Sequence, residues 1–217
     1  MNCLIATLGF DIDFVVRRLS RGGVSRVVCI GVRVDDTSWV RVEKAFNMIK
    51  IYCSSARVDC VLEPVKLDNA VVGEIRSILE REVRRGCSQL ELYLTGGPRI
   101  AVVSTIIASL LLPRDLANKV TINVEGEGFE ASLRIPLEPL IRILELSEVD
   151  RRIVVEASKE PLTPTELSRK TSIPKATAYR RMRLLASIGL LSKVSEVEER
   201  YTTTDSIVRL IKLARMV

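Results

Sequence analysis

The chain has 217 residues, of which 47% are hydrophobic, and a formal net charge of +6. These values predict a folded protein with room for one large domain, or for a domain and a small module. The sequence has no histidine, which excludes serine–histidine and cysteine–histidine catalysis and zinc sites that need imidazole. The apolar runs are too short to span a membrane, and the first residues lack the features of a signal peptide, so we expect a cytoplasmic protein without a membrane partner or a metal.

The charge is distributed unevenly along the chain. Residues 147–217 contain 14 Lys/Arg and 9 Asp/Glu, whereas residues 1–146 contain 19 and 18. The basic excess therefore belongs to the last third, which indicates contact with nucleic acid. The five cysteines form no C-x-x-C pair, and several lie in apolar runs, so we expect reduced, buried thiols at Cys3, Cys29, Cys53, Cys60 and Cys87.

Residues 1–136 alternate between apolar, β-branched runs and helical segments, which is typical of an α/β domain with a mostly parallel, Rossmann-like sheet. Two further strands at its end predict an antiparallel edge hairpin around the sequence EGEGF. The expected strands are 2–8, 26–34, 59–67, 89–95, 119–126 and 129–136, and the expected helices are 13–22, 38–56, 69–86 and 99–112.

Two strand-to-helix turns carry glycines beside a hydroxyl group: ATLGFD (6–11) and YLTGGPR (93–99). In the common strand order 3-2-1-4, strands 1 and 4 flank the point where strand order reverses, and ligands bind there. The double glycine permits a tight turn, and Pro98 suits the first turn of a helix whose free N–H groups attract anions. A tight turn without a ligand is the alternative. Neither turn matches a dinucleotide or P-loop motif, which disfavours a dinucleotide cofactor and an NTPase.

Segment 137–147 is expected to link this domain to a second one at 148–217. There Thr163 and Glu166 have capping-box spacing, the sequence TSIP forms a turn, and Pro174 opens the next helix, which is helix–turn–helix spacing. On that second helix we expect Ala178, Met182, Leu185 and Gly189 to face the core, with Leu184 and Ile188 beside them.

The opposite side of the second helix is basic, as a DNA recognition helix requires. A solvated basic face is the alternative. Residues 190–205 predict a wing of two short strands, whose acidic tip (Glu196, Glu198 and Glu199) repels DNA. The expected DNA contacts are Lys175, Ala176, Thr177, Tyr179, Arg180, Arg181 and Arg183 on the helix and Lys193 and Arg200 on the wing. A final amphipathic helix follows, with Ile207, Leu210, Ile211 and Ala214 on its apolar side.

The order of ATLGFD, LTGGPRIAVV and SIPKATAYRRMRLLASIGLL resembles that of archaeal CRISPR-associated transcription regulators. These proteins join an N-terminal CARF domain, a Rossmann-like ligand sensor, to a C-terminal winged helix. The resemblance implies a homodimer that binds a cyclic oligoadenylate across its two-fold axis, with cyclic tetra-adenylate as the expected ring. By motif position, the ligand contacts would be Thr7, Leu8, Gly9, Phe10, Thr95, Gly96, Gly97, Pro98 and Arg99. The chain has Gly-Gly-Pro-Arg where related sensors often have Gly-Gly-Thr followed by a lysine.

Our first hypothesis is therefore a ligand-responsive regulator of CRISPR-associated genes that binds promoter DNA and is not an enzyme. The second is a ring nuclease that cleaves the cyclic oligoadenylate slowly, with Arg99 and Thr7 as candidate groups, because in-line attack by a 2′-OH needs geometry more than a dedicated base. The third is an architectural DNA binder whose sensor fold takes no nucleotide.

Overall fold

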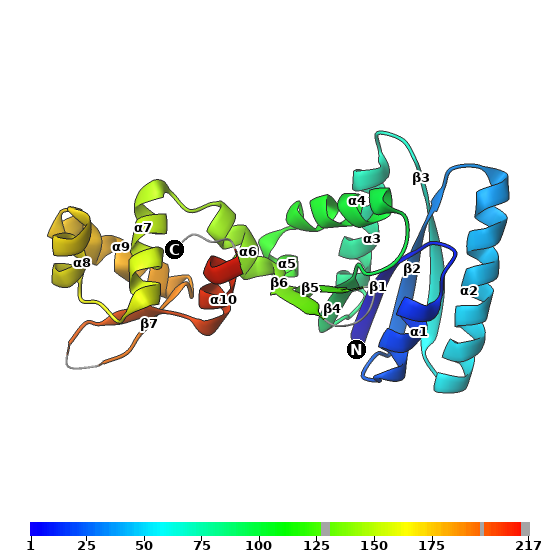
Figure 1. Cartoon of the computed structure of the whole chain (residues 1–217), viewed down its shortest axis with the longest axis horizontal. Coiled ribbons are helices and arrows are strands. Elements are labelled where there is room, and N and C mark those ends of the chain that lie inside the picture. The colour runs from blue at the N-terminus through cyan, green and yellow to red at the C-terminus, as the bar shows by residue number, and fades with distance from the viewer. Residues whose placement is uncertain (127–130, 196–197, 214–217) are drawn as a thin grey trace. The chain divides into compact units, whose positions relative to one another are not determined.

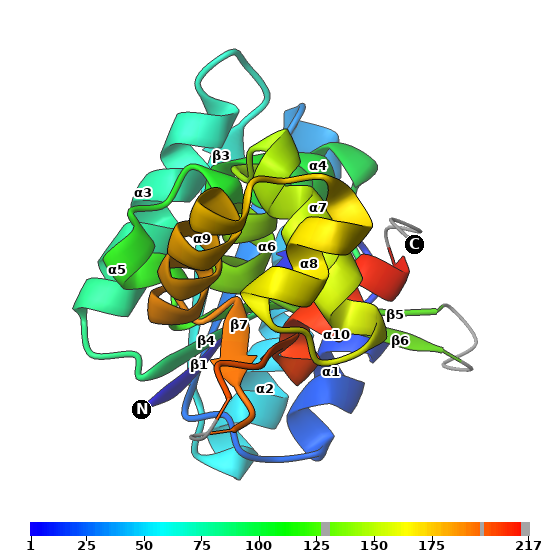
Figure 2. The ribbon, with the colours of Figure 1, turned by 90° about the vertical axis from the view of Figure 1, so that its left-hand side faces the viewer.

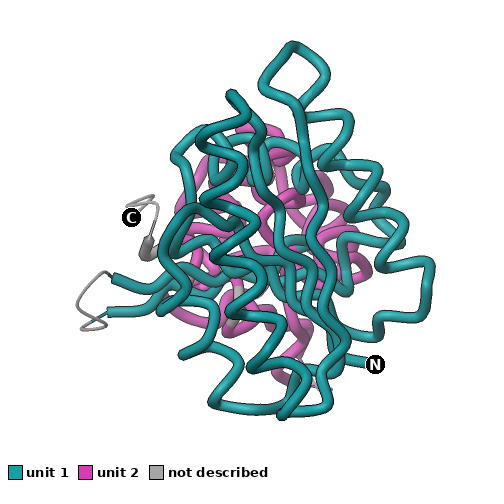
Figure 3. Tube along the Cα trace, turned by 90° about the vertical axis from the view of Figure 1, so that its right-hand side faces the viewer, with its two compact units in different colours: residues 1–138 teal, residues 139–217 magenta. Residues whose placement is uncertain are grey.

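The computed structural model describes residues 1–126, 131–195 and 198–213. The chain divides into two compact units, residues 1–138 and residues 139–217 (Figure 1 and Figure 3). The division falls between Glu138 and Pro139, inside the segment that the sequence analysis assigns to a linker. The first unit contains the alternation of strands and helices, and the second contains the short helices and a two-stranded hairpin.

The centre of the first unit is a six-stranded sheet with the order β3-β2-β1-β4-β5-β6. Neighbouring strands are parallel except β6, which pairs antiparallel with β5. The Rossmann-like prediction with an edge hairpin is confirmed, although residues 127–130 of the expected tip lie outside the described residues. The strands are β1 (Asn2–Leu8), β2 (Arg26–Arg33), β3 (Asp59–Lys66), β4 (Gln89–Tyr93), β5 (Val120–Glu125) and β6 (Ser132–Pro136).

Helices cover both faces of this sheet. One hydrophobic cluster joins α1 and α2 to β1 and β2 through Leu19, Trp39, Leu4 and Cys29. The helices α3 and α4 pack together on the other face (Figure 1). The helix α5 has only four residues, too few to show the helical periodicity by which a helix is predicted from sequence. The helices of this unit are α1 (Asp13–Ser20), α2 (Asp36–Ala56), α3 (Val71–Arg84), α4 (Arg99–Leu110) and α5 (Arg114–Ala117).

Two of the cysteines correct the expectation of reduced thiols. Cys3, near the start of β1, and Cys87, just before β4, form a disulfide with a Cα–Cα distance of 5.8 Å. Because β1 and β4 are adjacent and parallel, their amino ends bring these two residues together despite 84 residues of sequence separation. Cys29 and Cys53 are free, buried thiols, as expected, whereas Cys60 is a free thiol that is only half-buried.

The second unit is a helix–turn–helix followed by a hairpin, which confirms the predicted winged fold. Thr163 and Glu166 form the expected capping box: Thr163 Oγ1 accepts from the Glu166 backbone at 3.2 Å, and Glu166 Oε2 accepts from the Thr163 backbone at 2.8 Å. Figure 2 shows α7, α8 and α9 as neighbours. The elements are α6 (Leu137–Leu144), which begins before the division, then α7 (Glu148–Lys159), α8 (Pro164–Thr171), α9 (Lys175–Ser187), β7 (Leu191–Lys193), β8 (Tyr201–Thr203) and α10 (Asp205–Leu213).

The core side of α9 is narrower than the sequence predicts. Ala178, Met182 and Leu185 are buried, as expected, but Gly189 is exposed and Leu184 is 46% exposed. Leu184 lies next to the buried Leu185 along the chain and one helical turn after Arg180, on the exposed side, so its apolar character misled the assignment. On α10, Ile207, Leu210 and Ile211 are buried as expected, and Ala214 lies outside the described residues.

Candidate functional sites

The turns that follow β1 and β4 lie against each other. The two strands pair in parallel, so both turns emerge at the same edge of the sheet. The Thr7 hydroxyl donates a hydrogen bond to the Gly96 carbonyl oxygen. A Cβ on Gly9 would lie 3.3 Å from the Cα of Gly97. The two glycine motifs thus form one continuous backbone surface, as the predicted strand order requires.

Any residue with a side chain at position 97 would collide with the backbone of β1. Its φ is +88°, and a Cβ placed there would lie 2.8 Å from the Thr7 carbonyl carbon and 2.9 Å from the Thr7 oxygen. Both atoms belong to the backbone of β1, which cannot move without disrupting the sheet. The second glycine thereby lets the turn after β4 approach β1 closely.

The turn ends at the amino terminus of α4. Pro98 is the N-cap residue, and the exposed Arg99 begins the helix. The first N–H groups of a helix have no acceptor within the helix, and the helix dipole places partial positive charge there. Together with the Arg99 guanidinium, this helix start suits a negatively charged ligand.

Beside these turns lies a hollow of about 450 Å³. Four of the predicted ligand residues line it: Gly9, Phe10, Gly97 and Pro98. The other wall comes from the end of β2 and the start of α2. These segments carry no glycine motif, so nothing in the sequence marks them as part of the site. The residues of this wall and its margin are Asp11, Val32, Val34, Ser38 and Val42.

The other predicted ligand residues have different positions. Leu8 is fully buried in the hydrophobic cluster under α1 and α2, so its side chain faces the core. Thr7 is 1% exposed, and its hydroxyl is engaged by Gly96. The Thr95 hydroxyl accepts a hydrogen bond from the Glu125 backbone N–H at 2.9 Å, so it links β4 to β5. Gly96 lies against the Phe14 ring, which is 3.1 Å from a Cβ placed at Gly96.

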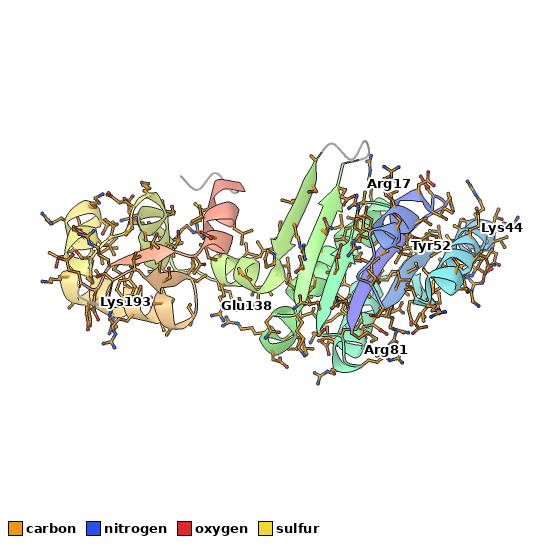
Figure 4. The ribbon with its side chains drawn as sticks, turned by 90° about the horizontal axis from the view of Figure 1, so that it is seen from below. Arg17, Lys44, Tyr52, Arg81, Glu138 and Lys193 are labelled. Carbon is orange, nitrogen blue, oxygen red and sulfur yellow. A yellow bond between two sulfur atoms is a disulfide. The ribbon has the colours of Figure 1, made fainter. Side chains whose placement is uncertain are left out.

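Phe10 is half exposed at the edge of the hollow. The guanidinium of Arg41, from α2, lies over its ring at 3.8 Å from the centroid. A cation over an aromatic face is attracted by the ring quadrupole, so this contact holds the turn after β1 against α2. Figure 4 shows Lys44 on the same helix, at the surface of the unit.

A charged cluster stands behind Thr95. The Glu125 carboxylate is bound by Arg21 and accepts a hydrogen bond from the buried Tyr93 hydroxyl at 2.9 Å. The hydrogen bond from the Arg21 guanidinium holds the pKa of the Glu125 carboxyl below its usual range. A second pair, Arg18 with Glu91, lies on the same face of the sheet. These contacts hold β4, from which the second turn emerges, to α1 and to the end of β5.

In the second unit, α9 presents a basic surface. Lys175, Ala176, Tyr179, Arg180 and Arg183 are exposed, and Thr177 and Arg181 are half-buried at its borders, as predicted. The Arg183 guanidinium donates to the Tyr179 hydroxyl at 3.2 Å. This surface has the side chains that a recognition helix uses for phosphates and guanine edges.

Arg181 is held at the border by α7. Its Nε lies 3.3 Å from Oδ1 of Asp150, an ion pair whose geometry does not make a hydrogen bond, so this buried oxygen has no hydrogen-bond partner among the described residues. The Asp150 Oδ2 accepts from the Ser147 hydroxyl at 2.7 Å. Arg181 therefore connects α9 to the start of α7.

The two predicted wing contacts differ in their surroundings. Lys193 is exposed at the end of β7 (Figure 4). The Arg200 guanidinium is engaged within the unit, at 2.9 Å from Glu166 and 3.1 Å from Glu198. It also donates to the Pro161 carbonyl oxygen at 3.0 Å. Glu198 is exposed, as expected of an acidic tip, and Glu196 lies outside the described residues.

Comparison with protein families decides the identity of the first unit. Residues 2–136, more than half of the chain, match the model of the Csa3 CRISPR-associated Rossmann-like domain. The chain belongs to this family. In this member of the Csa3 family, residues 143–194 also match the model of a helix-turn-helix domain. The protein thus combines a CRISPR-associated Rossmann-like domain of the CARF type with a helix-turn-helix domain.

Two solved structures align with the chain at low sequence identity. Can2 from Sulfobacillus thermosulfidooxidans, in complex with cyclic tetra-adenylate, aligns with 12% identity and a TM-score of 0.43. Protein VC1899 from Vibrio cholerae aligns with 13% identity and a TM-score of 0.45. The alignments cover 100% and 99% of the Csa3 family chain but only 64% and 65% of those two chains. A search of curated proteins finds no match.

Two further features concern the described part of the Csa3 family chain alone. None of its helices combines the length and apolar character needed to cross a membrane. Within the same residues, no group of three or more Cys, Asp or Glu side chains is arranged to hold a metal ion.

Proposed function

We propose that the protein is a ligand-responsive transcription regulator of CRISPR-associated genes. Its Rossmann-like domain binds a cyclic oligoadenylate, with cyclic tetra-adenylate as the preferred ring, and its winged helix binds promoter DNA. The observation that carries the proposal is the contact between the Gly9 and Gly97 turns, beside the start of α4, on a chain that also has a helix-turn-helix domain. A regulator needs a ligand site and a DNA-binding surface on one chain, and both are present as candidates.

The chemistry of the turn pair supports an anionic ligand. The close approach of Gly97 to β1 holds this turn at the edge of the sheet, and the backbone N–H groups of glycine turns are donors that a bulky anion can reach. The start of α4 adds partial positive charge, and Arg99 adds a full charge. A phosphodiester of a cyclic oligonucleotide provides the oxygens that such donors bind.

An apolar stripe on α4 supports a homodimer. Ile100, Val103, Ile107 and Leu111 are between 43% and 54% exposed and recur at helical spacing along one side of the helix. A contiguous exposed apolar stripe on a folded unit marks an interaction surface. Since α4 starts at the proposed ligand site, a two-fold contact through this stripe would bring two sites together. A cyclic ligand with two-fold symmetry fits that arrangement.

The described side chains do not favour the ring-nuclease alternative. Of its two candidate groups, Thr7 is 1% exposed, and its hydroxyl donates to the Gly96 carbonyl. It therefore has a structural role in joining the two turns. Arg99 is exposed and binds phosphate equally well in a regulator, so we propose a function without catalysis.

The direct test is calorimetric titration of cyclic tetra-adenylate into the protein. We expect binding of one ring per dimer, weakened at least tenfold by Arg99→Glu. Arg85→Glu, which reverses an exposed charge at the end of α3, is the control and should bind normally. Gly97 is unsuitable as a test because any side chain there collides with β1. Absence of heat with the unaltered protein would refute the proposed ligand.

Two further measurements separate the three hypotheses. Chromatography of the ligand after long incubation should recover it intact, whereas cleavage products would show a ring nuclease. Binding of promoter DNA should change when the ligand is added. Equal DNA affinity with and without ligand would favour an architectural DNA binder over a regulator.

A further inference from the structure

The hollow beside the turn pair has a chemistry different from that of the turns. Its wall on β2 and α2 consists of Val32, Val34 and Val42, and Phe10 and Pro98 add further apolar surface. Its volume of about 450 Å³ lies in the range of pockets that enclose small organic groups. An uncharged, flat group loses little by leaving water for such a wall, whereas a phosphate would lose its hydration without a partner.

The one charged group that lines the hollow is negative. Asp11 follows Phe10 in the turn after β1, and its Oδ1 accepts a hydrogen bond from the Asp13 backbone at 2.8 Å. No partner is found for its second oxygen among the described residues. The Ser38 hydroxyl is already engaged, since it donates to the Asp35 carbonyl at 3.1 Å. A carboxylate repels phosphate and can only accept hydrogen bonds, so it favours a ligand group that donates a hydrogen bond.

We infer that the hollow holds a base of the cyclic oligoadenylate and that Asp11 selects adenine through its exocyclic amino group. This assignment rests on the proposed function. The phosphates then lie at the start of α4, where Arg99 and the free N–H groups are, and the base lies against the valines. Hypoxanthine, the base of inosine, differs from adenine in that it carries a carbonyl oxygen in place of the exocyclic amino group. Asp11 would face that oxygen with like partial charge and no hydrogen bond.

The Phe10 ring completes the base site. It is 50% exposed at the edge of the hollow, and Arg41 covers one of its faces at 3.8 Å. Aromatic rings and guanidinium planes are the groups on which proteins stack unpaired bases. The Arg41–Phe10 pair thus supplies a rigid margin for a base that enters the hollow.

The test compares cyclic tetra-adenylate with its inosine counterpart by calorimetry on the full chain. We expect the unaltered protein to bind the adenine ring at least tenfold more tightly. In Asp11→Asn this preference should fall to about threefold or less, because an amide both donates and accepts and therefore pairs with either base. The substitution keeps the hydrogen bond from the Asp13 backbone, since an amide oxygen accepts as a carboxylate oxygen does.

Asp68→Asn is the matched control. Asp68 accepts from the Ala70 backbone at 2.7 Å, two residues on, just as Asp11 accepts from Asp13, but it lies before α3 and does not line the hollow. This variant should keep the full preference for adenine. If Asp11→Asn also keeps it, or if the unaltered protein binds both rings equally, the selection by Asp11 is refuted while the proposed function stands. If the unaltered protein binds neither ring, both proposals fail.

A second pair of variants tests the hollow itself. Val34 is 62% exposed at its margin, so Val34→Trp should fill the space and weaken cyclic tetra-adenylate binding at least tenfold without lowering the melting temperature. Val40→Trp places the same side chain on an exposed position of α2 outside the hollow and should bind normally. Unchanged binding in Val34→Trp would show that the base lies elsewhere.

Discussion

The hydroxyl of Thr7 donates a hydrogen bond to the carbonyl oxygen of Gly96, which joins the last residues of β1 to the turn after β4. The bond is partly buried, because Thr7 is 1% exposed and Gly96 is half-buried. The two glycine motifs are therefore one structural unit: the threonine holds the turn in place, and Gly97 lets it come close to β1. The stability of this contact is measurable independently of any ligand.

Replacement of Gly97 should destabilise the first unit more than replacement of a glycine with similar backbone geometry. Gly97→Ala introduces a Cβ 2.8 Å from the Thr7 carbonyl carbon at φ +88°. Gly23 has φ +76° and no neighbour within 4 Å of its Cβ position. We expect Gly23→Ala to cost about 1 kcal/mol from backbone strain, and Gly97→Ala about 2–4 kcal/mol, because the collision adds to the strain. Urea unfolding followed by circular dichroism measures both, and equal losses would contradict the close approach.

Reduction of the Cys3–Cys87 disulfide should lower the stability of the protein. The bond closes a loop of 84 residues, for which the loss of chain entropy in the unfolded state predicts about 4.5 kcal/mol. Urea unfolding with and without reductant measures the difference. The double variant Cys3→Ser, Cys87→Ser should be less stable and insensitive to reductant. Cys53→Ser keeps the disulfide and should retain the full sensitivity.

The charged cluster at the end of β5 should make the protein sensitive to acid. Arg21 lowers the pKa of Glu125 in the folded state. This carboxylate therefore contributes stability at neutral pH that is lost as the pH falls below about 4.3, the usual value for glutamic acid, and through the lowered one. Glu125→Gln should cost about 1–2 kcal/mol at pH 7 and flatten the acid limb of the stability curve. Thermal melts between pH 2 and pH 7 give both quantities, and an unchanged acid limb would exclude Glu125 as a contributor.

The basic side of α9 predicts a measurable salt dependence of DNA binding. Arg180 is exposed, and Arg180→Ala should reduce the slope of log affinity against log salt by about 1 if it contacts one phosphate. Lys159→Ala removes an exposed charge from the end of α7, where Lys159 pairs with Glu156, and should leave the slope unchanged. Equal slopes for the unaltered protein and Arg180→Ala would mean that α9 does not contact the DNA backbone at this residue.

The stripe on α4 predicts how the dimer is held. Ile107 is 44% exposed in the middle of the stripe, so Ile107→Asp should place a charge in the subunit contact and shift the protein to monomers in sedimentation velocity. Met48→Asp alters an apolar residue on α2 that is 57% exposed, and it should leave the dimer intact. A dimer that survives Ile107→Asp would place the subunit contact elsewhere.

The sequence predicted the fold well because the apolar runs are long and local. β1, for example, has six buried residues in a run of seven, and β2 has seven in a run of eight. The glycine turns were also predicted, since strand order alone brings Gly9 and Gly97 to one edge of the sheet. The orientation of individual side chains was harder to predict. Thr7 and Leu8 belong to the strand and not to the turn, and they therefore face the interior.

Contacts between distant segments were not visible in the sequence. The wall of Val32, Val34 and Val42 consists of ordinary apolar residues, and only the packing of α2 beside the turn after β1 makes it part of a hollow. The disulfide was not predicted for the same reason, because Cys3 and Cys87 come together only when β1 lies beside β4. Arg200 was assigned to DNA from its charge, whereas its pairing with Glu166 depends on how the wing folds back on α8.

The Cys3–Cys87 bond also alters how the chain responds to a protease. It encloses the first three strands and the first three helices in one covalent ring. A single cut in an exposed segment of that ring, such as the stretch between β3 and α3, leaves both pieces attached to each other. Such a nicked molecule migrates as one species on a denaturing gel until a thiol reagent is added, and only then separates into two fragments.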